Sequence, residues 1–374
     1  MTAVRKTYAH IDIAKFILAF FVVAIHVRPF DNWENPTVDA LFYSAAAVAV
    51  PYFFIASGFL CFARDEENPW KTGGQRARKQ AKAVLELYLI WTLIYLPIIA
   101  FGSMQDGLSV SEAVIRFVQG TIFVGENIWA WPLWYLLALA VALAVVSLFA
   151  RFAATPRGLA VFATAMLAAG AGLNMLNHAE TLPAAIAPLI DGYFDLFYTT
   201  RNGLFEGLFY VVCGVILGLN QHVVGQLKAP VIALIAAISY LGCVTITPSA
   251  QAPFCAVLAI CIFALTARTK TERSHRWMRS ANTIIYLVHM IFFVVVVYGV
   301  CGHTGSYIYG TDYNHMAVYL LVCALSIATA ALGIKLSAKC GLLKRIFHCQ
   351  LSRRQCKHKK TGEAGTSPVD FTMR

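Results

Sequence analysis

Charged residues are scarce in this sequence. Only 13% of its 374 residues are charged, whereas 59% are hydrophobic, and the mean hydropathy is +0.65. A water-soluble protein needs more polar residues than this to cover its surface, so the composition excludes a soluble globular protein. No polar linker sets apart a second globular domain, because the longest polar stretches are 63–82, 102–130, 177–202 and the segment from about 337. We therefore expect one membrane-embedded unit.

Apolar segments of membrane-spanning length recur along the chain. A membrane helix needs roughly 20 mostly apolar residues. The candidate spans lie near 11–27, 40–62, 83–101, 131–150, 158–176, 203–219, 229–247, 250–266, 281–301 and 316–336. The predicted fold class is all-α, a polytopic transmembrane helix bundle of about ten spans. We expect residues 1–336 to form this transmembrane domain and residues 337–374 to form a basic, disordered cytoplasmic tail.

The net charge of +11 follows the predicted topology. All but four of the 30 Lys and Arg residues fall in the termini and in every second connecting segment, the exceptions being Lys15, Arg28, Arg116 and Arg201. Basic residues stay on the cytoplasmic side of a membrane. Both termini are therefore predicted to be cytoplasmic, in a multi-pass protein of the inner (cytoplasmic) membrane. The basic residues thus set the orientation of the chain in the membrane and can attract anionic membrane lipid. The positive net charge therefore does not call for a nucleic-acid partner, and we expect none.

The ten cysteines predict no disulfide framework. Most of them fall within the predicted spans, at the inner ends of spans or in the cytoplasmic tail, where reducing conditions disfavour disulfides. Only Cys243 and Cys301 are expected near the outer face, which leaves them as the one pair to consider. The tail carries two His and two Cys between 348 and 358, but their spacing fits no zinc-ligand pattern, and we expect no metal site.

Three ionisable residues lie in the first predicted span. Asp12, Lys15 and His26 are spaced so that they fall along one face of a helix. Ionisable groups within lipid cost about 2.5–3.5 kcal/mol each on insertion scales, so they indicate function by default. A rise of about 16 Å separates Lys15, toward the cytoplasm, from His26, toward the outer side. Asp12 and Lys15 are expected to neutralise each other. The alternative is that these side chains extend to the headgroups.

Several motifs occur in an order that resembles a known family. Lys15-x10-His26 is followed by Pro51–Gly58, then by Tyr88–Trp91, Pro132–Leu136 and Ile285–His289. This order resembles the acyltransferase 3 family, whose first span ordinarily reads Asp-x-x-Arg-x10-His and whose second contains Pro-x-Phe-Phe-x-x-Ser-Gly. The stretch 200–205 further resembles the branch with the enterobacterial common antigen O-acetyltransferase and the membrane portion of VanT-type serine racemases. Lys15 departs from the usual Arg, which keeps the charge but loses the planar fork.

The resemblance implies an integral membrane O-acyltransferase. It would move an acyl group, expected to be acetyl, from cytoplasmic acyl-CoA to a hydroxyl of a cell-envelope carbohydrate or glycolipid. Acetyl-CoA or another acyl-CoA is thus the expected donor substrate, without a metal. A basic cluster is assigned to the donor's phosphates, and its members are Arg76, Arg78, Lys79 and Lys82. Because no esterase-like domain follows the bundle, a separate extracytoplasmic transferase is an alternative partner.

His26 is the expected catalytic residue. An imidazole, with a pKa of about 6.5, can take a hydroxyl proton near neutral pH. A transient acyl-histidine is chemically open as well, and the sequence does not decide between the two. Asp12 and Lys15 are assigned to the donor's entrance. His289 and Tyr286 share a helical face, and we expect them to orient His26 or the acceptor, or else to form a structural hydrogen bond between helices.

The acceptor is assigned to the outer side of the bundle. Arg201 and Glu206 flank the start of the sixth span and are expected to hold either the acceptor or each other. Trp134 lies where tryptophans form an interfacial belt or stack on sugars. Ser57 lacks the surroundings of a nucleophile and is interpreted as a small packing residue. The residues assigned to acceptor binding are Ser57, Trp134, Tyr135, Arg201, Asn202 and Glu206.

A transporter or flippase of a small polar substrate is the alternative function. A buried polar face would line a substrate path as well as it would line an active site. The sequence shows no internal repeat of the kind that many secondary transporters carry. The identity of the acceptor, the acyl chain length and the oligomeric state do not follow from the sequence.

Overall fold

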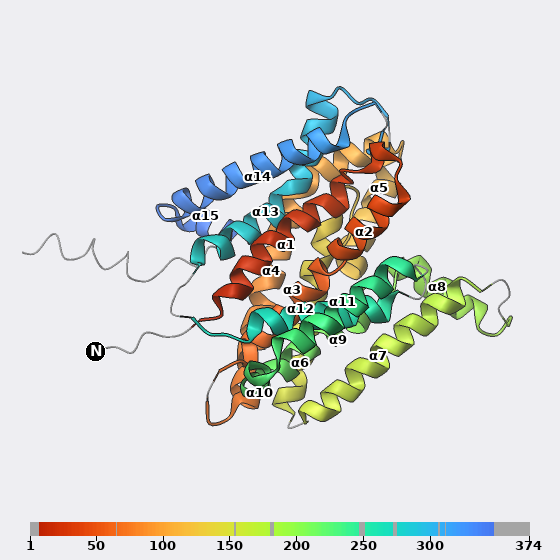
Figure 1. The fold of residues 1–374 in the computed structure, drawn as a ribbon. Coiled ribbons are helices and arrows are strands. Elements are labelled where there is room, and N and C mark those ends of the chain that lie inside the picture. Colours follow the sequence, from red (N-terminus) through yellow and green to blue (C-terminus); the bar gives the residue numbers. More distant parts are fainter. Residues whose placement is uncertain are drawn as a thin grey trace, which may run out of the picture.

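A computed structural model describes residues 7–64, 66–152, 155–179, 183–246, 251–271, 275–305, 307–310 and 312–347. The regular secondary structure of the described residues is helical, with one isolated bridge between Thr7 and Thr271 and no strand. Each predicted span overlaps one or two of these helices, which confirms an all-α polytopic bundle (Figure 1). By length and composition, seven of the described helices are long enough to cross a membrane, and three more are shorter apolar helices.

The apolar helices follow the predicted order along the chain. They are α1 (Ala9–Val27), α2 with α3 (Pro36–Ala46 and Ala49–Phe62), α4 (Pro69–Gln105), η3 with α6 (Trp131–Leu133 and Trp134–Arg151), α7 (Pro156–Asn177), η4 with α9 (Gly203–Gly207 and Leu208–Leu219), α11 (Ala229–Thr245), α12 (Ala252–Ala267), α13 with η5 (Arg276–Val294 and Val295–Val300) and α14 (His315–Ser337). Short helices lie between them, namely η1 (Asp31–Trp33), α5 (Val110–Gln119), η2 (Gly120–Val124), α8 (Ala187–Phe197) and α10 (Gln221–Gln226), and α15 (Gly341–Ile346) follows α14.

Side-chain caps fix where several of these helices begin. Asn35, Asn68, Thr155 and Asn314 each accept a hydrogen bond from a backbone N–H of the first turn. These N–H groups have no partner within the helix, so the cap satisfies them. A proline follows the first three caps directly, in the first helical position, where its missing N–H is not needed.

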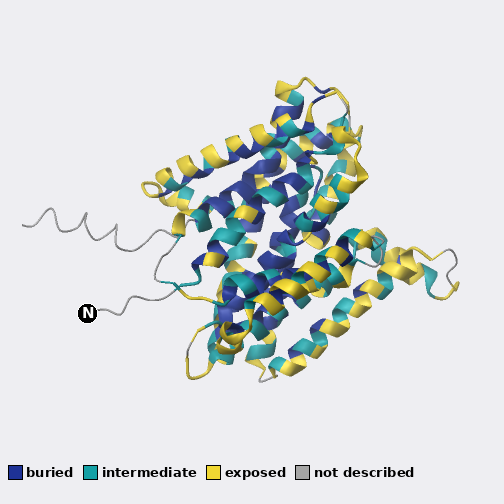
Figure 2. Ribbon diagram, in the orientation of Figure 1, coloured by how far each residue is buried: buried dark blue, intermediate teal, exposed yellow. Residues whose placement is uncertain are grey.

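The core of the bundle lies around α1, α3 and α13. In the span made by α2 and α3, 78% of the residues in its most apolar window are buried, against 17% in α7. Figure 1 shows α7 and α14 on opposite sides of the bundle, and Figure 2 shows exposed residues along both of them. These outer faces are apolar and would contact lipid, whereas α1 contacts other helices on its buried face. The first span is therefore placed to contribute to an internal site.

Helices α3 and α9 pack closely enough that glycine is required between them. A Cβ on Gly58 would overlap the carbonyl of Val211, and a Cβ on Gly214 would overlap the carbonyl of Ile55. Small residues at such crossings let helix backbones approach one another in membranes. The pair α3 and α9 is therefore closely packed along its crossing.

Substitution of Gly218 tests this packing. A Cβ at Gly218 would lie 2.9 Å from the carbonyl oxygen of Phe59 and 3.1 Å from the backbone nitrogen of Ala63. We expect Gly218→Ala to lower the free energy of unfolding by about 1–3 kcal/mol, because overpacking moves α9 away from α3. Gly172→Ala is the control, since nothing lies within 4 Å of its added Cβ. Thermal unfolding in detergent measures both, and equal stability of the two variants would contradict the packing argument.

Part of the segment that was expected to be a disordered tail is ordered. Helix α15 lies within 337–374, and the indole N–H of Trp91 on α4 donates to the carbonyl of Ile346 at 2.9 Å. The ring of Phe347 lies 6.1 Å from that of Trp91. The first eleven residues of this segment therefore dock on the bundle, where Ile346 and Phe347 contact α4. Residues 348–374 lie outside the described residues.

Candidate active site

The carboxylate of Asp12 on α1 is buried and pairs with an arginine from a distant helix. Arg279, in the first turn of α13, donates from Nε to Oδ1 at 2.9 Å and from Nη2 to Oδ2 at 2.7 Å. The Asp12 side chain is 3% exposed and the Arg279 side chain 36%. The expectation that Asp12 and Lys15 neutralise each other is therefore corrected. Arg279 offers a planar fork that matches both carboxylate oxygens, and Lys15 cannot make that bidentate contact.

Lys15 lies on the same helix without an ion-pair partner among the described residues. Its Nζ lies 5.8 Å from the centre of the Phe53 ring on α3, over the ring face. The side chain therefore points toward α3 and not toward lipid. An ammonium that is partly buried within a bundle and has no counter-ion is costly, so Lys15 is a candidate for contact with an anionic group of a substrate.

His26 lies near the other end of α1 and faces the interior of the bundle. Its ring centre is 5.4 Å from that of His289 on α13 and 6.4 Å from that of Trp131 in η3. The side chain is partly accessible, whereas His289 is fully buried. The geometry brings together His26 and His289, which were both predicted from the sequence as site residues.

The hydrogen bonds of His289 define its tautomer. Its Nδ1 lies 2.7 Å from the carbonyl oxygen of Tyr286 and 3.2 Å from that of Ile285. A carbonyl oxygen only accepts, so Nδ1 carries the proton and Nε2 keeps a lone pair in the neutral ring. Nε2 is buried and has no hydrogen-bond partner among the described residues. A buried acceptor without a partner, on a ring beside His26, is suited to accept a proton or a hydrogen bond.

Aromatic residues cover the outer side of His26. The ring of Trp131 stacks on that of Tyr309 at 6.1 Å, and the guanidinium of Arg28 lies 5.8 Å from the Tyr309 ring centre. Burial is the largest influence on Tyr309 and raises the pKa of its hydroxyl. The segment between η5 and α14 that carries Tyr309 is held by His303, whose Nδ1 contacts Asp312 at 2.8 Å. The sequence did not predict that Tyr309 lies over Trp131, since no motif distinguishes this loop tyrosine from the others.

Arg201 and two carboxylates lie on the outer side as well. The guanidinium of Arg201 lies over the ring of Trp134 at 4.6 Å. Glu206 is partly buried, and it makes no ion pair with Arg201 in the described structure. Glu126 in the loop before η3 is a further partly buried acid, and burial raises its pKa although Arg201 lowers it. Glu126 was not predicted, because a lone acid in a loop is ordinarily solvated.

Other predicted acceptor residues serve the fold. Asn202 accepts from the backbone N–H of Leu204 and of Phe205, and thus caps η4. The hydroxyl of Ser57 donates to the carbonyl of Phe53 at 2.8 Å, within its own helix. These two side chains have local partners, which agrees with a packing role for Ser57.

Tyr286 and Tyr135 form one aromatic contact beside the histidines. Their ring centres are 5.7 Å apart, and the hydroxyl of Tyr286 donates to the carbonyl of Pro132. Tyr135 also packs on Phe54 at 4.7 Å. This contact joins α13 to η3 and α6, and so fixes where His289 lies relative to His26. Tyr286 thus positions its neighbours through its ring and hydroxyl.

The basic cluster on α4 divides into paired and unpaired members. Arg76 donates from Nη1 to both carboxylate oxygens of Glu66 at 2.8 Å. A hydrogen bond from the Thr72 side chain and, next to it, those from Arg76 lower the pKa of Glu66. Arg76 is therefore engaged by the protein itself, and its assignment to the donor's phosphates is weakened. Arg78, Lys79 and Lys82 are exposed and have no ion-pair partner among the described residues. These three charges stay available to an anionic ligand.

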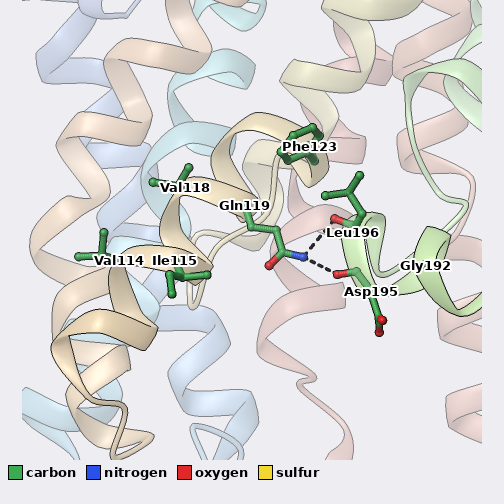
Figure 3. A pocket seen from close by; sticks show the side chains of 8 residues that line it. All are labelled: Val114, Ile115, Val118, Gln119, Phe123, Gly192, Asp195 and Leu196. Atoms are coloured by element: carbon green, nitrogen blue, oxygen red, sulfur yellow. Dashed lines mark hydrogen bonds between the residues drawn. The ribbon is translucent and has the colours of Figure 1, made fainter.

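A separate apolar groove of about 480 Å³ lies between α5 and α8 (Figure 3). Gln119 bridges the two helices by donating to the carbonyls of Asp195 and Leu196. The groove contains none of the predicted site residues, and its exposed wall is made of valine, isoleucine, phenylalanine and leucine. Amphipathic helices of this kind lie in the membrane interface.

Among the described residues, no group of three or more His, Cys, Asp or Glu is arranged for a metal ion, and the tail cluster at 348–358 lies outside them.

Comparison with known proteins gives a family and distant relatives. A family model described as an acyltransferase domain matches residues 8–335. An amino-acid racemase of Enterococcus faecalis is 21% identical over 352 residues, which cover 90% of this chain and 47% of that protein. A serine/alanine racemase of Enterococcus gallinarum is 25% identical over 336 residues, which cover 87% of this chain and 46% of that protein. The chain thus spans about half the length of these relatives. No solved structure matches it.

Proposed function

The chain belongs to the acyltransferase 3 family, and from this premise we propose that it transfers an acetyl group from cytoplasmic acetyl-CoA to a hydroxyl of a cell-envelope carbohydrate or glycolipid. Membership of the family supports acyl transfer, and the apolar helices support a protein that crosses the membrane several times. The choice of acetyl, of a carbohydrate acceptor and of the inner membrane is our proposal.

One observation carries this proposal. His26 faces into the bundle and lies beside the unpartnered Nε2 of His289, while Lys15 lies on the same helix without an ion-pair partner in the described structure. The ammonium and the imidazole are separated by about 16 Å along α1. That distance suits a donor that enters from the cytoplasm and reacts toward the outer side. In this proposal, α1 contacts the acyl donor through Lys15 and the acceptor through His26.

The residues present support general-base chemistry. A ring nitrogen of His26 takes the proton of the acceptor hydroxyl while the hydroxyl oxygen attacks the thioester carbonyl. The C–S bond then breaks, and the CoA thiolate takes the proton back from the imidazolium. The Nε2 lone pair of His289 accepts a hydrogen bond from the imidazolium N–H, which stabilises the charge formed in the transition state. Trp131 and Tyr309 would limit access of water, which would otherwise compete with the acceptor.

We assign the donor's phosphates to the unpaired basic residues of α4. Exposed lysines act on phosphate as point charges, and their effect is screened by salt. We expect the double variant Lys79→Ala/Lys82→Ala to bind acetyl-CoA about three- to tenfold more weakly at low ionic strength, which corresponds to about 1 kcal/mol.

Calorimetric titration of the purified protein with acetyl-CoA measures this change in affinity. We expect the difference from the wild-type protein to shrink as salt is added, because the Debye length falls to about 8 Å at 0.15 M. Arg151→Ala is the matched control, since it removes an exposed basic residue from the end of α6, outside the cluster. Equal weakening by Arg151→Ala would show that net charge acts and that the cluster has no specific role.

Movement of a small polar substrate is the second candidate function. It is favoured by the relatives, which are named as racemases of amino acids and are about twice as long as the aligned segment. A segment shared with such proteins would carry the racemase's substrate across the membrane. Purified protein in liposomes separates the two functions. Acetyl-CoA consumption without flux of labelled serine supports the acyltransferase, and serine flux without acetyl-CoA consumption supports the transporter.

A further inference from the structure

Two cysteines on adjoining helices lie with their sulfur atoms in close contact. Sγ of Cys243, in the last turn of α11, is 3.0 Å from Sγ of Cys255, in the first turn of α12. Cys243 is buried, and Cys255 is partly accessible. The sequence suggested only Cys243 with Cys301, because Cys255 was placed within a span or at its inner end. The structure corrects this, since Cys255 lies at the same end of the hairpin as Cys243.

Neighbouring residues hold the two sulfur atoms in this position. Gly242 allows the ring of Phe254 to lie directly on α11, because a Cβ at that glycine would overlap the ring. The hydroxyl of Ser44 on α2 donates to the carbonyl of Cys243 at 3.1 Å. The hydroxyl of Tyr240 donates to the carbonyl of Leu41 at 2.8 Å. Packing against α2 and against Phe254 therefore fixes the end of α11, and the thiols meet as a consequence.

The pattern of basic residues predicts the compartment of this pair. Lys228 directly precedes α11, and Arg268 and Lys270 directly follow α12. These residues mark the cytoplasmic ends of the two helices. The cysteines lie at the opposite ends, around the connection 246–251, and so on the outer side of the membrane. Extracytoplasmic compartments are oxidising, and disulfides form and persist there.

We propose that Cys243 and Cys255 form an intramolecular disulfide that closes the hairpin of α11 and α12 on the outer side. The Cys255 thiolate, which is the more accessible, attacks the disulfide of an extracytoplasmic dithiol–disulfide oxidoreductase and forms a mixed disulfide. The Cys243 thiolate then attacks the sulfur of Cys255 and releases the oxidoreductase as a dithiol. Two protein thiols become one disulfide, and the two electrons and two protons leave on the oxidoreductase. Small rotations of the two side chains bring the sulfurs to the bonding distance of about 2.05 Å.

The bond would fix the outer end of a hairpin that supports the centre of the bundle. The hydroxyls of Thr266 on α12 and Tyr52 on α3 are 2.7 Å apart, within hydrogen-bond distance. The ring of Phe263 on α12 lies 5.1 Å from that of Phe59 on α3. Closing α11 onto α12 would therefore stiffen a hairpin that already packs against α3, which is a structural role independent of acyl transfer.

Differential alkylation of the full-length protein tests the proposal. Membranes from cells with an oxidising outer compartment are denatured with N-ethylmaleimide, then reduced, and the thiols so released are labelled with iodoacetamide before mass spectrometry. We expect Cys243 and Cys255 to carry the second label in most molecules. The first label on both of them in most molecules would overturn the proposal, and so would protection of Cys243 jointly with Cys301. The wild-type chain alone decides the result, so a misfolded variant cannot obscure it.

Two variants identify the partner. Cys255→Ser is expected to move Cys243 to the first label. Cys261→Ser, which removes another buried cysteine of α12, should leave Cys243 and Cys255 protected. If Cys261→Ser also exposed Cys243, the pairing with Cys255 would be refuted.

Discussion

Replacing His26 by alanine is expected to reduce acyl transfer by about 10²- to 10⁴-fold, the contribution typical of a general base. The imidazole faces His289 and Trp131 and makes no hydrogen bond within the described structure that the fold would lose. The amount of folded protein in the membrane should therefore stay unchanged. Release of free CoA from acetyl-CoA, measured on protein reconstituted with envelope glycans, gives the rate.

His178→Ala is the matched control for His26→Ala. His178 lies exposed at the end of α7, with its Nδ1 2.8 Å from the carbonyl of Asn174. We expect this variant to retain the wild-type rate. Retained activity in His26→Ala would refute the assignment of the base, and loss of folded protein in that variant would show that His26 supports the fold.

Replacing Arg279 by alanine is expected to lower the free energy of unfolding by about 3 kcal/mol. Removing one partner of a buried ion pair typically costs about 3–5 kcal/mol, because the other charge is left buried. Here the stranded group is Asp12, whose side chain is 3% exposed. We expect the lower end of this range, because the ammonium of Lys15, one helical turn after Asp12, still offsets part of the carboxylate's charge. Asp12→Ala should cost less, since the Arg279 guanidinium is 36% exposed and can reach the headgroups.

Thermal unfolding in detergent measures these effects, with Arg276→Ala as the control. Arg276 is an exposed arginine one turn earlier in α13 and has no ion-pair partner among the described residues. The double variant Asp12→Ala/Arg279→Ala should be more stable than Arg279→Ala alone, because it also removes the buried carboxylate that loses its arginine partner. If Arg276→Ala and Arg279→Ala lowered the unfolding temperature equally, the ion pair would not be the cause.

The fold followed from the sequence because long apolar segments in a chain of this composition have few other structures available to them. The alignment of Asp12, Lys15 and His26 followed from helical periodicity alone. Their partners did not follow, because pairing depends on which helix packs against α1. Arg279 was counted as a topological charge, although it lies 2.7 Å from the buried Asp12. The contact between Cys243 and Cys255 was not predicted, because the bounds of α12 were estimated from hydropathy, which does not define where a helix begins or ends.

Smaller features depended on packing for the same reason. Tyr309 covers Trp131 and Glu126 lies near Arg201, yet both come from loops whose path the sequence does not define. Arg76 looked like a member of a free basic cluster, but Glu66 lies close enough in space to engage it. Local pattern thus identified the helix that carries the site, and tertiary contacts determined which charges remain free to act.

Mass spectrometry of cell-envelope glycans tests the central claim most directly. Cells that make the wild-type protein, the His26→Ala variant or no protein are supplied with isotope-labelled acetate, which enters acetyl-CoA. Acyl transfer through His26 predicts that one defined envelope glycan gains labelled acetyl groups with the wild-type protein alone. Identical glycan acetylation in all three strains would contradict it, and the imidazole of the first helix would then need a different explanation.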